Sequence, residues 1–88
     1  MSKIDIFLLA TLFGKNRLSL STIVQRIQFM KITQPPSRIT IYQRLHTLKG
    51  NELVNISWEE GKKLYEISPQ GMLVITEFKE QLSGLKLV

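Results

Sequence analysis

The chain has 88 residues, a formal net charge of +5, one histidine and no cysteine. A chain of this length forms one domain and buries only about 60% of its unfolded surface, so a partner subunit would add to a small core. Without cysteine it has no disulfides and no thiolate chemistry, and a single histidine excludes a multi-histidine metal site. We expect no metal or other cofactor, and a reducing cytoplasm as the location.

The positive charge is concentrated in the first half of the sequence. Residues 1–50 contain eight Lys or Arg and one acid, whereas residues 51–88 contain four Lys or Arg and six acids. This asymmetry favours nucleic acid or another anionic surface as the partner, although a basic balance can also serve solubility alone.

The first predicted element is a helix over residues 4–13, an almost uninterrupted apolar run. Asp5 interrupts the run, which is also too short to span a bilayer, so we expect neither a signal peptide nor a membrane span. A helix that is apolar nearly all the way round needs cover on more than one side. We therefore expect part of it to contact another molecule.

A second helix is predicted after Ser19 or Ser21, either of which can cap it, with Ile23, Ile27 and Met30 along one face. The tandem prolines of "KITQPPS" end this helix, because the residue before a proline disfavours the α region. A short, stiff turn should therefore join it to the next helix.

The third predicted helix follows Ser37, a second capping residue, and Gly50 and Asn51 end it. Its inward stripe consists of Ile41, Leu45 and Leu48. Its outward face carries Ile39, Thr40, Gln43 and Thr47, with Tyr42 and Arg44 on the flanks.

Two strands and a last helix complete the chain. "LVNISW" and "LYEI" alternate apolar and polar residues around a turn that contains Gly61, which predicts a hairpin. Ser68 is placed to cap the last helix, with Pro69 at its first position. The apolar positions of this helix are Ile75, Phe78, Leu82 and Leu85.

The predicted order is helix, helix, helix, hairpin, helix, with a tight turn between the second and third helices. This is a mainly α fold with a small β-hairpin, the winged helix-turn-helix. We expect residues 1–88 to form a single domain of this type, a fold that binds DNA.

Residues 37–71 contain two further patterns. Ser37, Thr40, Ile41 and Tyr42, followed by Leu45 and Leu48, are similar to an S-x-x-T-L-Y-x-x-L-x-x-L helix. Trp58, Gly61, Lys62, Lys63, Tyr65, Ile67 and Gly71 follow a W…G-[KR]-x-x-Y-x-[LI]-[ST]-x-x-G pattern. This segment resembles the core of the PadR family of winged-helix transcriptional regulators. The resemblance implies a DNA-binding dimer, and it allows a small-molecule effector of unknown identity.

We expect the third helix to enter the major groove of DNA. Thr40, Gln43 and Thr47 would meet base edges, while Ser37, Arg38, Tyr42 and Arg44 would reach phosphates. Lys62 and Lys63 would form a wing tip that tracks phosphates or the minor groove. The alternatives are a solvated polar helix face and an ordinary charged turn.

The remaining functional residue types give weaker signals. His46 is expected on the outward half of the third helix, in contact with DNA or with solvent. Trp58 and Tyr65 can line an effector pocket or belong to the core. No Gly-rich phosphate loop occurs in the sequence, no nucleophile has a partner set, and Glu59 and Glu60 do not converge, so we expect no enzyme.

The function predicted is that of a sequence-specific transcriptional regulator, a repressor that binds an inverted-repeat operator as a homodimer. The first and last helices, the latter at about residues 68–85, would join the two subunits. The predicted dimer contacts are Ile4, Phe7, Leu8, Ile75, Phe78, Leu82 and Leu85. The alternatives are a winged-helix protein-interaction module and a plasmid or phage partition or replication protein.

Overall fold

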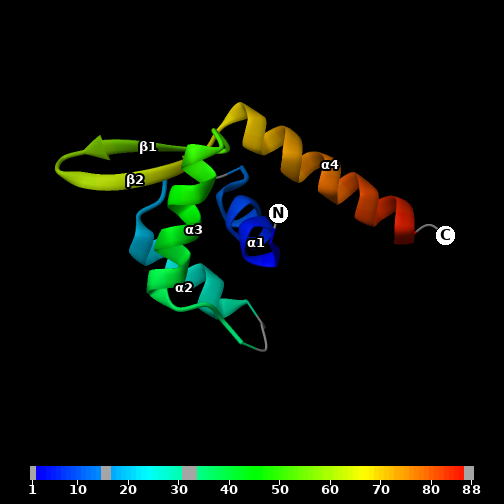
Figure 1. Cartoon of the computed structure of the whole chain (residues 1–88), viewed down its shortest axis with the longest axis horizontal. Helices are drawn as coiled ribbons and strands as arrows, with labels where there is room; N and C mark the ends of the chain where they lie inside the picture. Colours follow the sequence, from blue (N-terminus) through cyan, green and yellow to red (C-terminus); the bar gives the residue numbers. More distant parts are fainter. Residues whose placement is uncertain (1, 15–16, 31–33, 87–88) are drawn as a thin grey trace.

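The computed structural model describes residues 2–14, 17–30 and 34–86, with side chains described as far as residue 80. Its elements are α1 (Lys3–Leu12), α2 (Leu20–Phe29), α3 (Arg38–Gly50), β1 (Val54–Glu59), β2 (Lys62–Ile67) and α4 (Pro69–Lys86) (Figure 1). This order confirms the predicted winged helix. In this part of the chain no helix is long and apolar enough to cross a membrane.

Serine side chains begin the first three helices. The hydroxyls of Ser2, Ser19 and Ser37 each accept a hydrogen bond from the backbone N–H three residues later, which satisfies a donor that the helix leaves free. Ser19, rather than Ser21, is therefore the cap of α2. At α1 the carboxylate of Asp5 also accepts from the Ser2 N–H, which completes a reciprocal capping box.

The core forms around α1, which contacts α2, α3, α4 and β2. Leu8, Leu9 and Leu12 of α1 have no exposed surface. The buried residues that surround them are Ile23, Val24, Ile27, Ile41, Leu45, Leu48, Val54, Tyr65, Ile67 and Ile75. The inward stripe predicted for α3 is thus confirmed. The chain itself covers α1 on several sides, and contact between α1 and a second molecule stays a prediction.

The wing is a two-stranded antiparallel hairpin in which Glu59 pairs with Lys62 across a two-residue turn. Both turn residues, Glu60 and Gly61, have positive φ values of 52° and 76°, as in the turns whose twist matches a hairpin. Leu18, just before α2, exchanges two backbone hydrogen bonds of 2.8 Å with Tyr65 and so holds β2 against the helical body.

Helix α4 begins beside the end of α3 and extends away from the rest of the molecule (Figure 1). Ser68 fixes this start: its N–H donates to the Leu53 carbonyl at 3.0 Å and its hydroxyl donates to the Glu52 carbonyl at 2.6 Å. Glu52 has a φ of 63°, a conformation that favours glycine. Further along α4, Ile75 is buried, whereas Leu73 is 65% exposed.

Candidate nucleic-acid interface

The outer face of α3 lies as predicted from the helical periodicity. Ile39 is 69% exposed, and Gln43 and Thr47 are exposed as well. Thr40 is half-buried, and its hydroxyl lies 3.0 Å from the hydroxyl of Ser37. The Thr47 hydroxyl donates to the Gln43 carbonyl, which leaves its lone pairs free to accept. The face can therefore offer both hydrogen-bond donors and acceptors, the groups that read base edges.

The start of α3 is tied to the start of α2. Arg38 Nη2 donates to the hydroxyl of Ser21 at 3.2 Å, across the turn that contains the two prolines. Both residues are exposed, so the guanidinium keeps further donors for a phosphate. The contact links the first turns of the two helices of the helix-turn-helix.

Arg44 has a partner within the chain. Its Nε donates to Oδ1 of Asp5 at 2.8 Å and its Nη2 donates to Oδ2 at 2.6 Å, a bidentate ion pair between α3 and α1. The hydrogen bonds from Arg44 lower the pKa of the Asp5 carboxyl, although burial acts in the opposite direction. In the free chain Arg44 therefore links α3 to α1, and its contact with a phosphate stays a prediction. The pairing of Asp5 with Arg44 was not predicted from the sequence. The capping-box spacing of Ser2 and Asp5 places a carboxylate in the first turn of α1 but does not indicate its partner on α3.

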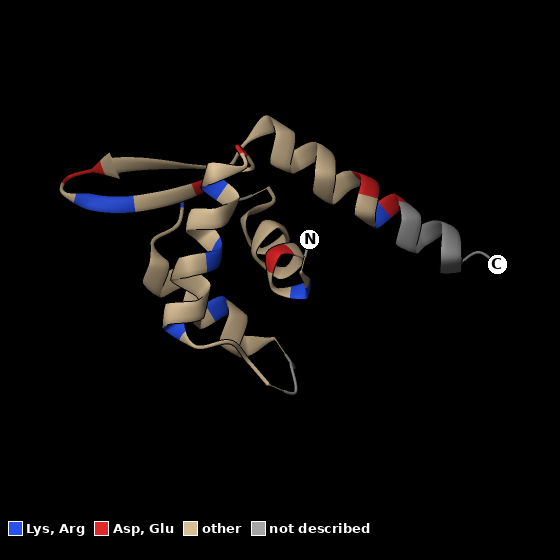
Figure 2. Ribbon diagram, in the orientation of Figure 1, with Lys and Arg blue, Asp and Glu red and all other residues tan. Residues whose placement is uncertain are grey.

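The two wing lysines differ in their surroundings. Lys62 is exposed at the turn, as a phosphate contact requires. Lys63 is half-buried and reaches α3, where its Nζ lies 3.1 Å from Nε2 of His46 and 5.1 Å from the ring centroid of Tyr42. Lys63 therefore joins the wing to α3. Figure 2 shows Lys and Arg on α2, on α3 and near the turn of β2, and also on α1 and α4.

The predicted pair of Trp58 and Tyr65 is divided by the structure. Tyr65 is 1% exposed and belongs to the core, whereas Trp58 is 68% exposed on the wing. Trp58 pairs with Lys63 across the hairpin, on the face that carries Tyr65 nearer the body. The hairpin extends beyond the core at this point, which the alternation of strand residues does not reveal.

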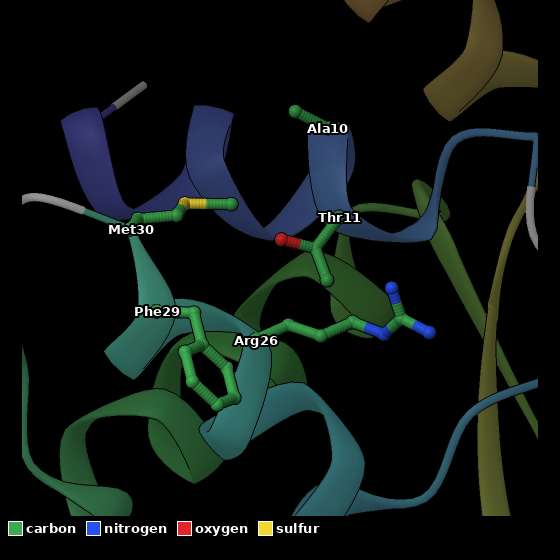
Figure 3. Close-up of a pocket in the computed structure, with 5 residues that line it drawn as sticks. All are labelled: Ala10, Thr11, Arg26, Phe29 and Met30. Carbon is green, nitrogen blue, oxygen red and sulfur yellow. The ribbon is translucent and has the colours of Figure 1, made fainter.

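A separate pocket of about 310 Å³ lies between α1 and α2 (Figure 3). Its lining residues are Ala10, Thr11, Arg26, Phe29 and Met30, and Phe29 is 86% exposed. None of them is among the predicted DNA contacts. Across the described ranges there is no group of three His, Cys, Asp or Glu side chains that could hold a metal ion.

No protein-family model matches the chain. No curated protein matches it in sequence either. Solved structures share its fold. A PadR-family transcription regulator from hypervirulent Clostridium difficile superposes with a TM-score of 0.85 at 16% identity, over 97% of this chain and 92% of that one. The fold is that of the PadR-family regulators. The resemblance inferred from residues 37–71 is thereby confirmed at the level of the fold.

Two further structures support this assignment. A PadR-like transcription factor from Bacteroides fragilis gives a TM-score of 0.81 at 20% identity, over 94% of this chain and 82% of that one. BpsR of Bordetella bronchiseptica, whose DNA binding is regulated by 6-hydroxynicotinic acid, superposes with a TM-score of 0.76 at 21% sequence identity, over 96% of this chain. The chain spans 59% of the length of BpsR.

Proposed function

We propose that the chain is a sequence-specific DNA-binding transcription regulator, a repressor that occupies an inverted-repeat operator as a homodimer in the cytoplasm. The observation that carries the proposal is the exposed face of α3, which presents Gln43 and Thr47 beside a wing that bears Lys62. Winged helices read DNA with such a helix in the major groove and with a basic hairpin on the backbone. By analogy with BpsR, we include a small-molecule effector among the expected partners.

Selection of bound duplexes from a random pool tests this function. We expect an enriched inverted repeat whose half-sites lie about 34 Å apart, or a multiple of that distance. Affinity should fall as salt rises, because Lys and Arg that bind phosphates displace counterions. A winged-helix protein-interaction module would instead show no salt-sensitive affinity for any duplex, and that result would refute the proposal.

The first prediction separates base contacts from phosphate contacts. Gln43→Ala or Thr47→Ala should relax base preference, since one good base contact is worth about 1–3 kcal/mol of discrimination. Lys62→Ala should instead weaken binding to all duplex sequences alike. It should also reduce the slope of log affinity against log salt concentration by about 1. Titration of the selected duplex and of single-base variants of it, at several salt concentrations, measures both effects.

Matched controls come from α4. Gln70→Ala and Lys79→Ala make the same chemical changes on exposed residues outside the proposed interface. Both should leave specificity and salt slope as in the wild type. The assignment of α3 as the reading helix fails if Gln43→Ala, Thr47→Ala and Gln70→Ala all keep the wild-type base preference.

The homodimer part of the proposal is based on the open side of α1 and α4. Lys3, Ile6, Phe7 and Phe78 line a largely apolar pocket of about 420 Å³ there, and Phe78 is 36% exposed. A second copy of the chain would cover this surface and would present two α3 helices, as an inverted repeat requires.

The predicted contact set changes in three respects. Ile6, which was not predicted as a dimer contact, lines the apolar pocket and is added to the set. Leu8 and Ile75 are buried inside the chain, so we exclude them from the dimer surface. The side chains of Leu82 and Leu85 lie outside the described residues. The proposed surface therefore consists of Ile4, Ile6, Phe7 and Phe78.

The second prediction is that Phe78→Glu yields a monomer, because it places a charge in the apolar contact between subunits. Sedimentation at tens of micromolar should show a dimer for the wild type and a monomer for the variant. Thr76→Glu adds the same charge to an exposed position about 200° away around α4 and should remain a dimer. A monomeric wild type at these concentrations would contradict the proposal.

A further inference from the structure

The contact between Lys63 and His46 places two nitrogen groups close together where the wing meets α3. Lys63 Nζ lies 3.1 Å from His46 Nε2, and the His46 ring packs against Tyr42 with its centroid 4.4 Å away. An ammonium group only donates, so Nε2 must be the acceptor and the ring must be neutral, with its proton on Nδ1. The contact therefore exists only while His46 is unprotonated.

The surroundings of His46 favour this neutral form in the free protein. Desolvation lowers the pKa of its imidazole, and the positive charges of Lys63 and Lys49 lower it further. Lys49 follows His46 by three residues on α3, so both side chains lie on the same side of the helix. Within the described part of the chain, these two lysines are the charged groups that act on His46, and both are cationic.

The positive charges of this cluster would attract an anion. Two cations and a third group that can become cationic meet on an exposed surface between the proposed reading helix and the wing. A phosphate placed there would accept a hydrogen bond from Lys63 in place of the imidazole lone pair. It would also favour the protonated ring, which could then donate from Nε2 to a second phosphate oxygen.

We propose that Lys63, His46 and Lys49 form a phosphate-binding site for the DNA backbone, and that His46 takes up one proton from solvent as the phosphate binds. The inference rests on the proposed DNA-binding function and adds that DNA binding is coupled to the protonation of His46. DNA affinity should then increase as pH falls, with His46 as the group responsible.

The composition of the chain allows the pH dependence of DNA binding to be assigned to one residue. His46 is the only histidine, and there is no cysteine. Between pH ~5.5 and ~7, carboxylates and the α-amino group contribute little, because their ordinary pKa values lie outside this range. Phosphodiesters do not titrate there either. The pH dependence of DNA binding in this interval therefore reports on His46.

The experiment uses the full chain and a mixed-sequence duplex of about 30 base pairs, three helical turns, at constant ionic strength. We expect affinity to rise by up to about tenfold for each pH unit of decrease, the limit for uptake of one proton. In parallel, the pKa of His46, followed through its ring-proton NMR resonance, should rise when the duplex is added.

His46→Gln is the matched variant, since its amide keeps hydrogen-bonding capacity and cannot titrate in this range. Its affinity for the duplex should change little with pH over this interval, so the advantage of the wild type over His46→Gln should grow as the pH falls. Measurable binding with a flat pH profile in the wild type, an equal slope in His46→Gln, or a His46 pKa that does not rise with DNA would overturn this inference alone. Absence of any duplex affinity would overturn the proposed function as well.

Discussion

Gly71→Ala is expected to lower the free energy of unfolding by about 3 kcal/mol, as overpacking against atoms that cannot move aside does. Gly71 is buried in the first turn of α4. A β-carbon at this position would overlap the backbone oxygen of Leu53 and would lie 2.7 Å from Cγ1 of Ile67. The strain comes from this close approach, since Gly71 itself has ordinary helical backbone angles.

The backbone of Leu53 cannot retreat without breaking other contacts. Its carbonyl accepts from the Ser68 N–H at 3.0 Å, and the Ser68 hydroxyl accepts from the Gly71 N–H at the same distance. A shift of α4 would therefore disrupt its N-cap together with the junction between α3, β1 and α4. Equilibrium denaturation monitored by circular dichroism measures the loss.

Gly50→Ala is the control for this substitution. Gly50 is the last residue of α3, and a β-carbon there would meet nothing within 4 Å. Because alanine loses less backbone entropy than glycine in a helix, this variant should be unchanged or more stable by up to about 1 kcal/mol. If Gly71→Ala were as stable as Gly50→Ala, the result would contradict a close approach of α4 to the backbone of Leu53.

Arg44→Met is expected to destabilise the protein more than Asp5→Ala does, although both variants remove the same ion pair. Asp5 is 2% exposed, so loss of Arg44 leaves a buried carboxylate without its counter-charge. Loss of Asp5 leaves a guanidinium on a side chain that is 35% exposed and can rehydrate. Asp5→Ala also removes half of the α1 capping box, so we expect it to cost about 1–3 kcal/mol. The double variant should be more stable than Arg44→Met alone.

The pH dependence gives an independent test of this pair. The pKa of Asp5 in the folded protein is lowered below its ordinary value of 3.8, so its stabilising effect is complete above that pH and is lost as the pH falls through the folded value. Arg44→Met removes the largest cause of this lowering, while burial and the hydrogen bonds with Ser2 remain, so the pKa of Asp5 should be higher than in the wild type. The variant should therefore recover stability relative to wild type as the pH falls from 7 towards ~4. Parallel stability curves for the two proteins between these pH values would show that Arg44 does not neutralise Asp5.

Local sequence patterns determined the fold and much of the outer face of α3. Ser19 and Ser37 cap helices because a hydroxyl at that position satisfies a free N–H, and this depends on neighbours within the same turn. The spacing of Ile41, Leu45 and Leu48 places them on one side of a helix, which leaves Gln43 and Thr47 on the other. Such relations are contained in a single element and can be predicted without knowledge of the rest of the chain.

Contacts between elements far apart in the sequence were decided only by the tertiary structure. Asp5 and Arg44 are 39 residues apart, and His46 and Lys63 are 17 apart, yet each pair is joined at hydrogen-bond distance. Helical periodicity gives the side of α3 on which Arg44 or His46 lies, but it does not specify which segment packs against that side. Because packing selects the partner of each charge, it made Arg44 a structural link between helices and brought Lys63 from the wing to α3.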